Sequence, residues 1–110
     1  MKVKRQKNSL PKGHLLQHYR IERTIGGGGF SIVYLAVDEK TGEPVAIKEY
    51  LPSTQAQRSE EARVEPITED TASAYRQGIK RFFDEAAALA KVNHPNIVRV
   101  VNFFRANNTV

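Results

Sequence analysis

Residues 25–34 read Ile-Gly-Gly-Gly-Gly-Phe-Ser-Ile-Val-Tyr, four glycines that lead directly into β-branched and aromatic residues. The stretch before this run, from Tyr19, alternates apolar and polar side chains, which is typical of a half-buried strand. Residues 32–37 are rich in the side chains that strands favour. The glycine run is therefore predicted to connect the two strands of a β-hairpin.

Other glycine-rich structures fit this context less well. A flexible linker would not be expected between two adjoining strands. A dinucleotide-binding fingerprint must open a helix, and the β-branched run after Phe30 is a poor helix start. A Walker A loop ends in Gly-Lys-Ser or Gly-Lys-Thr, which the sequence lacks. A glycine-rich hairpin remains, and its small residues let backbone N–H groups approach phosphates closely.

A third strand is predicted at residues 45–50, after a polar turn at residues 38–42. Two successive hairpin connections imply an antiparallel meander. Lys48 alternates with Ala46, so both side chains point to the sheet face over which the glycine loop folds. An ammonium group on that face can pair with phosphates, but it needs a carboxylate partner because its unpaired burial is costly.

A helix is predicted from Thr68, which offers a capping hydroxyl, to the residues just before Pro95, which cannot continue a helix. Apolar residues recur between these ends at helical spacing. On a helical wheel, Asp84 lies opposite the apolar face, whereas Glu85 lies at its edge beside the sheet. Glu85 is therefore the predicted partner of Lys48.

The remaining segments complete the predicted fold. Residues 97–104 are predicted as a fourth strand, residues 106–108 as a turn, and residues 109–110 as the start of a fifth strand. The polar and acidic stretch 53–67 is predicted to be a loop, although most connections are shorter. The expected fold class is α+β, with an antiparallel sheet of four strands plus a truncated fifth and one long helix packed on it.

Composition indicates an ordinary globular domain. The chain has 110 residues, of which 40% are hydrophobic and 26% charged, so one domain is expected. No apolar run approaches the roughly 20 residues that a membrane helix needs. The sequence has no cysteine, which excludes disulfides and thiolate metal sites and fits a cytoplasmic location.

The net charge of +5 is concentrated at the N-terminus, where the first twelve residues hold five lysines and arginines and no acid. Residues 1–18 are predicted to be a basic, flexible arm, and residues 19–110 the folded domain. Such an arm can touch nucleic acid or anionic lipid, but a solvated tail is the favoured interpretation, so no nucleic-acid partner is expected. His14 and His18 are four residues apart with no third ligand near, and no metal site is predicted.

These motifs, together with His94-Pro95-Asn96-Ile97, resemble the N-terminal lobe of a protein kinase. They occur in the family's order between residues 25 and 97, and the nearest resemblance is to bacterial serine/threonine kinases of the eukaryotic type. The fold that the resemblance implies is a protein-kinase-like N-lobe, whose long helix corresponds to the helix that kinase descriptions call αC.

The resemblance implies an ATP site. The glycine loop would cover the phosphates, Val33 and Ala46 would enclose the adenine, and Lys48 would hold the α- and β-phosphates and pair with Glu85. Ser31 stands where the family's loop has its third glycine, so altered contact with ATP is expected. The implied ATP-binding residues are Ile25, Gly26, Gly27, Gly28, Gly29, Phe30, Ser31, Val33, Ala46 and Lys48.

The kinase motifs that carry catalysis have no match in this sequence, which lacks both the His-Arg-Asp loop and the Asp-Phe-Gly magnesium site. No catalytic or metal-binding residue is therefore assigned here, and Mg²⁺ ligands are expected in a second lobe. The expected function is ATP binding within a serine/threonine kinase that phosphorylates a protein substrate. The alternative is a pseudokinase-like module that binds nucleotide or a partner without catalysis. The oligomeric state is left open.

Overall fold

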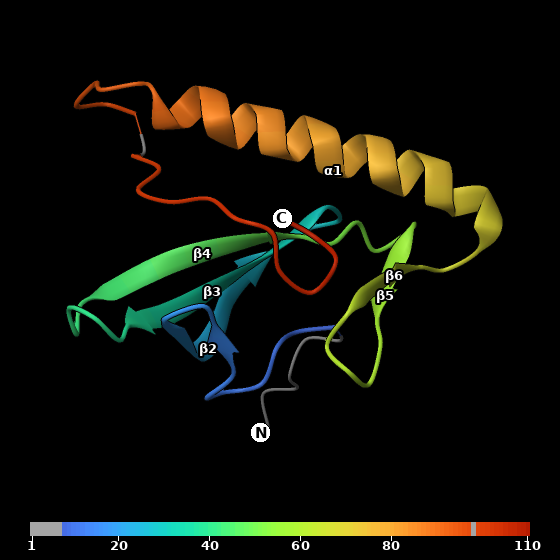
Figure 1. Cartoon of the computed structure of the whole chain (residues 1–110), viewed down its shortest axis with the longest axis horizontal. Helices are drawn as coiled ribbons and strands as arrows, with labels where there is room; N and C mark the ends of the chain where they lie inside the picture. Colours follow the sequence, from blue (N-terminus) through green and yellow to red (C-terminus); the bar gives the residue numbers. More distant parts are fainter. Residues whose placement is uncertain (1–7, 98) are drawn as a thin grey trace.

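The computed structural model describes residues 8–97 and 99–110 of the chain. A curled four-stranded antiparallel sheet carries one long helix across it, and a small two-stranded sheet lies near the start of the helix (Figure 1). In the order β1-β2-β3-β4, the larger sheet comprises Leu15–Leu16, Tyr19–Gly27, Ser31–Asp38 and Pro44–Tyr50. Helix α1 spans Glu69–Ala90. The predicted α+β fold is confirmed.

The glycine run connects β2 to β3 as predicted. Gly28 N donates a hydrogen bond to Ser31 O at 3.1 Å and closes the connection. Strands β3 and β4 then pair in a register that places Val33 opposite Lys48 and Leu35 opposite Ala46. The three strands thus form the meander that the sequence indicates.

The two faces of this sheet differ in burial. On β3, the side chains of Ile32, Tyr34 and Ala36 are buried, while the intervening Val33 and Leu35 are only partly covered. Because strand side chains alternate between faces, one face of the meander packs into the core and the other stays open. The open face is the one that carries Ala46 and Lys48.

The fourth strand of the sheet is not the predicted one. Leu16 of β1 pairs with Tyr19, whereas no described residue in the stretch 97–104 belongs to a strand. That stretch packs through its side chains instead: the Phe104 ring stacks on Tyr19 at 5.9 Å between centroids, and Phe103 meets Phe83 at 5.2 Å. The strand prediction was wrong, because Phe103 and Phe104 pack through their rings and not through backbone pairing, while Ile97 and Val101 are exposed.

The turn predicted at residues 106–108 is confirmed. Ala106 and Thr109 form a backbone bridge around Asn107 and Asn108, whose positive φ angles of 53° and 66° are left-handed values that asparagine tolerates. Beyond the turn, the Val110 carbonyl accepts a hydrogen bond from Tyr50 N at 2.9 Å. Residues 109–110 therefore lie beside the end of β4.

The stretch predicted as a loop contains a hairpin. Strand β5 (Ala56–Arg58) pairs with β6 (Val64–Pro66) in the smaller sheet. Ala56 and Val64 are completely buried. The prediction of a plain loop was wrong, because two three-residue strands joined by a polar turn are too short to show a period of two in the sequence.

Helix α1 begins where the sequence predicts. Thr68 is its N-cap and forms a capping box with Thr71, and Glu69 and Asp70 lie in the first turn, where acids favour the helix dipole. The helix ends at Ala90, a few residues before the predicted end. Only its Tyr75 is buried, so most of α1 is exposed on at least one side.

The N-terminal segment is described from Asn8 onward. Leu10 and Leu16 are buried, so the stretch from Asn8 to His18 lies against the sheet. Most of the basic residues of the predicted arm precede Asn8 and lie outside the described residues, so the division of the chain at residue 18 stays a prediction. In the described ranges, no helix combines the length and apolar character needed to cross a membrane.

Candidate functional site

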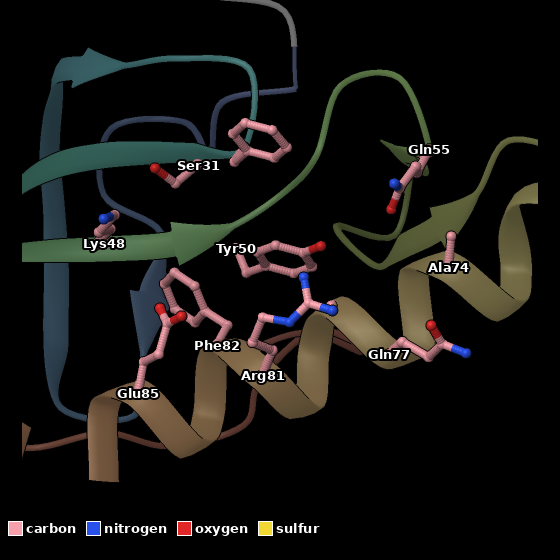
Figure 2. Close-up of a pocket in the computed structure, with 11 residues that line it drawn as sticks. Ser31, Lys48, Tyr50, Gln55, Ala74, Gln77, Arg81, Phe82 and Glu85 are labelled. Carbon is pink, nitrogen blue, oxygen red and sulfur yellow. The ribbon is translucent and has the colours of Figure 1, made fainter. Parts of the chain in front are cut away.

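A pocket of about 410 Å³ lies where the glycine hairpin, the end of β4, the inserted hairpin and α1 meet (Figure 2). Lys48 enters it from β4, and Glu85 enters it from α1. The full lining is Phe30, Ser31, Lys48, Tyr50, Gln55, Ala74, Gln77, Gly78, Arg81, Phe82 and Glu85. Ser31, at the end of the predicted glycine loop, and Glu85, the predicted partner of Lys48, therefore line the same pocket.

A second and more apolar pocket, of about 510 Å³, adjoins the first and shares Lys48, Phe82 and Glu85 with it. Val33 and Ala46 form part of its wall on the open face of the sheet. The predicted adenine-contacting residues and the predicted phosphate-contacting lysine thus line a common space.

The structure brings some of the predicted residues together and not others. Phe30, Ser31 and Lys48 line the first pocket, and Val33 and Ala46 line the second. Ile25 and the four glycines that follow it line neither of these two pockets, and Ile25 is exposed. The assignment of the ATP-binding residues stays a prediction.

Lys48 and Glu85 face the same pockets, but no ion pair joins them. The Lys48 ammonium instead lies 5.8 Å from the centre of the Phe82 ring, within the range of a cation–π contact. Both charged side chains are exposed. The pairing of Lys48 with Glu85 also stays a prediction.

Arg81 is a member of the pocket that sequence reasoning missed. It lies one helical turn before Glu85 and lines the same pocket (Figure 2). Burial raises the pKa of Tyr50, and the positive charge of Arg81 partly opposes that rise. The pocket is thus lined by two positively charged side chains, Lys48 and Arg81, and by one carboxylate, that of Glu85. The helical wheel could have indicated Arg81, because a residue four positions before Glu85 lies on the same side of the helix.

Tyr50 fixes how closely α1 approaches β4. Its ring lies 6.1 Å from Tyr75 and 5.2 Å from Phe82, centroid to centroid. A Cβ atom at Gly78 would come within 1.8 Å of the Tyr50 hydroxyl, so only glycine admits this contact. A glycine inside a helix was the available signal, since it costs helix stability and often marks a packing contact.

The glycine loop is open above its backbone. A Cβ atom placed at Gly28 or Gly29 would meet nothing within 4 Å, and Phe30 at the tip is 71% exposed. The segment after β4 fixes the loop by two backbone hydrogen bonds. Ser53 N donates to Gly29 O and Leu51 N donates to Phe30 O, each at 2.9 Å. A group larger than a methyl can therefore reach this backbone.

On the opposite face of β4, Glu49 is buried and makes an ion pair with Arg58. The Tyr34 hydroxyl donates to the same carboxylate at 2.7 Å. Burial raises the pKa of Tyr34, and the charge of Glu49 raises it further. Sequence reasoning missed this cluster, because Arg58 lies in a stretch predicted to be a loop.

The described residues contain no group of three or more histidines, cysteines or acids that could hold a metal ion. The residues present therefore do not fit a magnesium site on their own.

Comparison with known proteins identifies the family. Residues 19–110 match the protein kinase domain. The chain is 32% identical over 92 residues to the serine/threonine-protein kinase srk1 of Schizosaccharomyces pombe, a match that covers 82% of this chain and 14% of srk1. It is 38% identical over 82 residues to the probable serine/threonine-protein kinase pknA2 of Bifidobacterium longum, covering 74% of this chain and 9% of pknA2.

A solved structure, "PpkA-294 apo form", superposes with a TM-score of 0.89 at 36% identity and covers 93% of this chain and 36% of that one. The chain thus spans only a small part of the length of the curated kinases that it matches. The family match, the similarity to kinases and this superposition agree with the sheet-and-helix architecture. The chain belongs to the protein kinase family and forms the N-terminal lobe of the kinase fold.

Proposed function

We propose that this chain binds ATP as the nucleotide-holding lobe of a serine/threonine protein kinase. The observation that carries the proposal is the convergence of Lys48, from β4, and Glu85, from α1, on the pocket that Ser31 borders (Figure 2). A fixed positive charge at the end of an open sheet face is suited to the phosphates, and the carboxylate on the facing helix is suited to orient that charge.

The open face of the sheet is suited to the base of the nucleotide. Val33 and Ala46 line the apolar pocket that adjoins Lys48. A flat aromatic base placed against these side chains would direct its phosphates toward Lys48 and the glycine loop. Ile25, at the start of that loop, is proposed to border the base.

The glycine loop is proposed to cover the phosphates. The open space above Gly28 and Gly29 lets a phosphate approach the backbone N–H groups, with Gly26, Gly27 and Phe30 completing the hairpin. Ser31 closes the loop with a side chain where a glycine would leave more room. The Mg²⁺ ion that kinases use with ATP is proposed to be held by a second lobe.

The proposed reaction of the whole kinase is transfer of the γ-phosphate to a serine or threonine of a protein substrate. The relatives named as serine/threonine kinases support this substrate class. Catalysis of this kind depends on positioning and on charge stabilisation by the metal. We also propose a cytoplasmic location, where ATP and such substrates are present, and we propose no nucleic-acid partner.

A pseudokinase-like module is the second candidate. It is favoured by the open Lys48–Glu85 arrangement and by Ser31 in the glycine loop. The two candidates share nucleotide binding and differ in catalysis. Incubation of a protein that contains this lobe together with a second lobe with radiolabelled ATP and a serine/threonine peptide library separates them, since only the kinase transfers label.

Nucleotide binding is tested by calorimetric titration of ATP into this chain and into Lys48→Met. We expect weak binding, because a second lobe would supply half of the pocket, and a loss of about tenfold or more in affinity for Lys48→Met. Lys40→Met is the matched control, because Lys40 is exposed in the turn before β4. Unchanged affinity in Lys48→Met would contradict the assignment of Lys48.

A further inference from the structure

Helix α1 has few fixed points, which are Tyr75 and Gly78 in its first half and the rings of Phe82 and Phe83, which pack on Tyr50 and Phe103. Tyr75 is its one buried residue, and β6 is the strand that its backbone approaches most closely. The hairpin β5–β6 lies beside the first turns of α1 in Figure 1. Glu85, about four turns along the helix, therefore depends for its position on these ring contacts and on how the first half of α1 is held.

The hairpin leads directly into the helix. Ile67, which follows β6, donates its N–H to the carbonyl oxygen of Gln55, which precedes β5, at 2.9 Å. This hydrogen bond joins the two ends of the hairpin. Thr68 then accepts a hydrogen bond from Thr71 N at 3.3 Å and caps the helix. The position and direction of the first turn of α1 are thus set by the hairpin.

A second connection joins the hairpin to α1 through the C-terminal turn. Val64 N donates to Asn107 O at 2.7 Å, and Asn108 Nδ2 donates to Val64 O at 2.8 Å. The Tyr75 hydroxyl donates to Asn108 O at 2.8 Å. The hairpin and the helix are therefore connected by hydrogen bonds that run from Val64 through the turn at Asn107 and Asn108 to Tyr75.

Arg58 anchors the hairpin to the rest of the lobe. Its side chain is 8% exposed, and its guanidinium reaches four acceptors in different segments. They are Asn8 O (2.9 Å), Ala62 O (2.8 Å), Tyr34 Oη (3.3 Å) and the Glu49 carboxylate. A planar fork with five N–H donors can satisfy such a set, whereas a lysine ammonium cannot.

The partner of Arg58 connects it to the nucleotide face. Glu49 follows Lys48 on β4, and successive strand residues point to opposite faces. The Arg58–Glu49 pair therefore fixes the hairpin to the strand that presents Lys48, while the same hairpin fixes the helix that presents Glu85.

We propose that the β5–β6 hairpin is a brace between β4 and α1, and that Arg58 is the positioning residue that anchors this brace. Arg58 acts through other groups and touches no nucleotide. Its effect on ATP binding rests on the function proposed above for Lys48 and Glu85, but the anchoring of α1 does not.

The brace is tested first without nucleotide. Amide hydrogen exchange is measured by mass spectrometry on the native chain, on Arg58→Met and on Arg63→Met, whose exposed side chain lies in the same hairpin. We expect exchange in residues 69–85 to accelerate about tenfold or more in Arg58→Met, with smaller changes in β2 and β3 and none in Arg63→Met. Uniform acceleration over sheet and helix, or protection of α1 equal to the native chain, would overturn the brace.

If Arg58→Met does not fold, Arg58→Lys takes its place in the same measurement. It retains the charge next to Glu49 and loses the fork that reaches Asn8 and Ala62. A smaller acceleration with the same restriction to α1 is expected. An Arg58→Lys chain with native exchange in α1 contradicts the positioning role.

The link to the nucleotide site is tested by a double-mutant cycle on ATP affinity. We expect Arg58→Lys to weaken binding about threefold or more in the native background and to have no effect in Glu85→Gln, because the two residues act in series. Equal weakening in both backgrounds would show that Arg58 does not act through Glu85. If Lys48→Met binds ATP as the native chain does, the proposed function fails while the exchange result still decides the brace.

Discussion

Lys48 and Glu49 are neighbours on β4, but their charged groups lie on opposite faces of the strand and in different environments. On the pocket face, Lys48 is exposed and makes no ion pair with a described carboxylate. On the opposite face, Glu49 is 5% exposed, and its carboxylate is shared by Arg58 and the Tyr34 hydroxyl. One charge is available to a ligand, and the other is fully engaged inside the lobe.

The difference follows from the cost of burial. A charge removed from water must be paired and hydrogen-bonded, which Glu49 achieves through two partners, Arg58 from the inserted hairpin and Tyr34 from β3. A charge that serves a ligand must keep its hydration until the ligand arrives, which Lys48 can do only on an open face. The role of a charged residue on β4 therefore depends on the face of the sheet that it occupies, and substitutions on the two faces should have different effects.

The largest effect is expected on the buried face. Glu49→Gln removes the charge next to Arg58 and should lower the free energy of unfolding by about 3–5 kcal/mol, because an unpaired guanidinium stays buried. Urea unfolding followed by circular dichroism measures the loss. The double variant Glu49→Gln/Arg58→Met should recover part of the lost free energy of unfolding. A loss under about 1 kcal/mol in the single variant would show that the buried charge of Glu49 matters no more to stability than an exposed one.

On the pocket side, contact rather than charge is expected to matter. Gly78→Ala places a Cβ atom 1.8 Å from the Tyr50 hydroxyl, so α1 or the ring must move. Overpacking costs about 1–3 kcal/mol and the better helix propensity of alanine returns about 1 kcal/mol, which leaves a net loss of about 0–2 kcal/mol. Ser73→Ala, at an exposed position of α1, is the control in the same unfolding assay.

Alkaline pH should weaken the buried cluster through Tyr34. Burial and the charge of Glu49 raise the pKa of this phenol, so the folded lobe holds a proton that the unfolded chain releases above pH of about 10. Stability is thus complete below that pH and falls above it, by about 1.4 kcal/mol per pH unit for this group. Tyr34→Phe should unfold with a shallower pH dependence between pH of about 10 and 11, and an identical slope would contradict the assignment.

The smallest effect is expected for Lys48. Its substitution by methionine should change the free energy of unfolding by less than about 0.5 kcal/mol, because the side chain is exposed and makes no ion pair in the described structure. The same urea series measures it beside Glu49→Gln. A loss comparable to that of Glu49→Gln would show that Lys48 is a structural residue.

The meander and the helix were predictable because their signals are local. Alternation marks β2 to β4, and the capping hydroxyl of Thr68 marks the start of α1. The strand prediction for residues 97–104 was wrong, because Phe103 and Phe104 pack on Phe83 and Tyr19, and no local sequence pattern reports such contacts. The three-residue strands of the inserted hairpin were too short to be recognised.

The candidate site divides in the same way. Lys48 and Glu85 were found because strand alternation and the helical wheel place them on facing surfaces, whereas Ser31 was assigned through the resemblance of the glycine loop to that of kinases, and the three residues line one pocket. Arg58 was not found, because its role arises only when the inserted hairpin folds onto β4. Its partners are far apart in the sequence, and only the tertiary structure brings them together.

The open space above Gly28 and Gly29 has a consequence for the entropy of the chain. Neither residue has a positive φ angle, so the folded hairpin would accept alanine at both positions. Alanine would restrict the unfolded chain and stabilise the lobe by about 0.4–1 kcal/mol at each position. The two glycines thus make the lobe less stable than its backbone allows, and what they provide in return is room for another molecule to lie against the main chain.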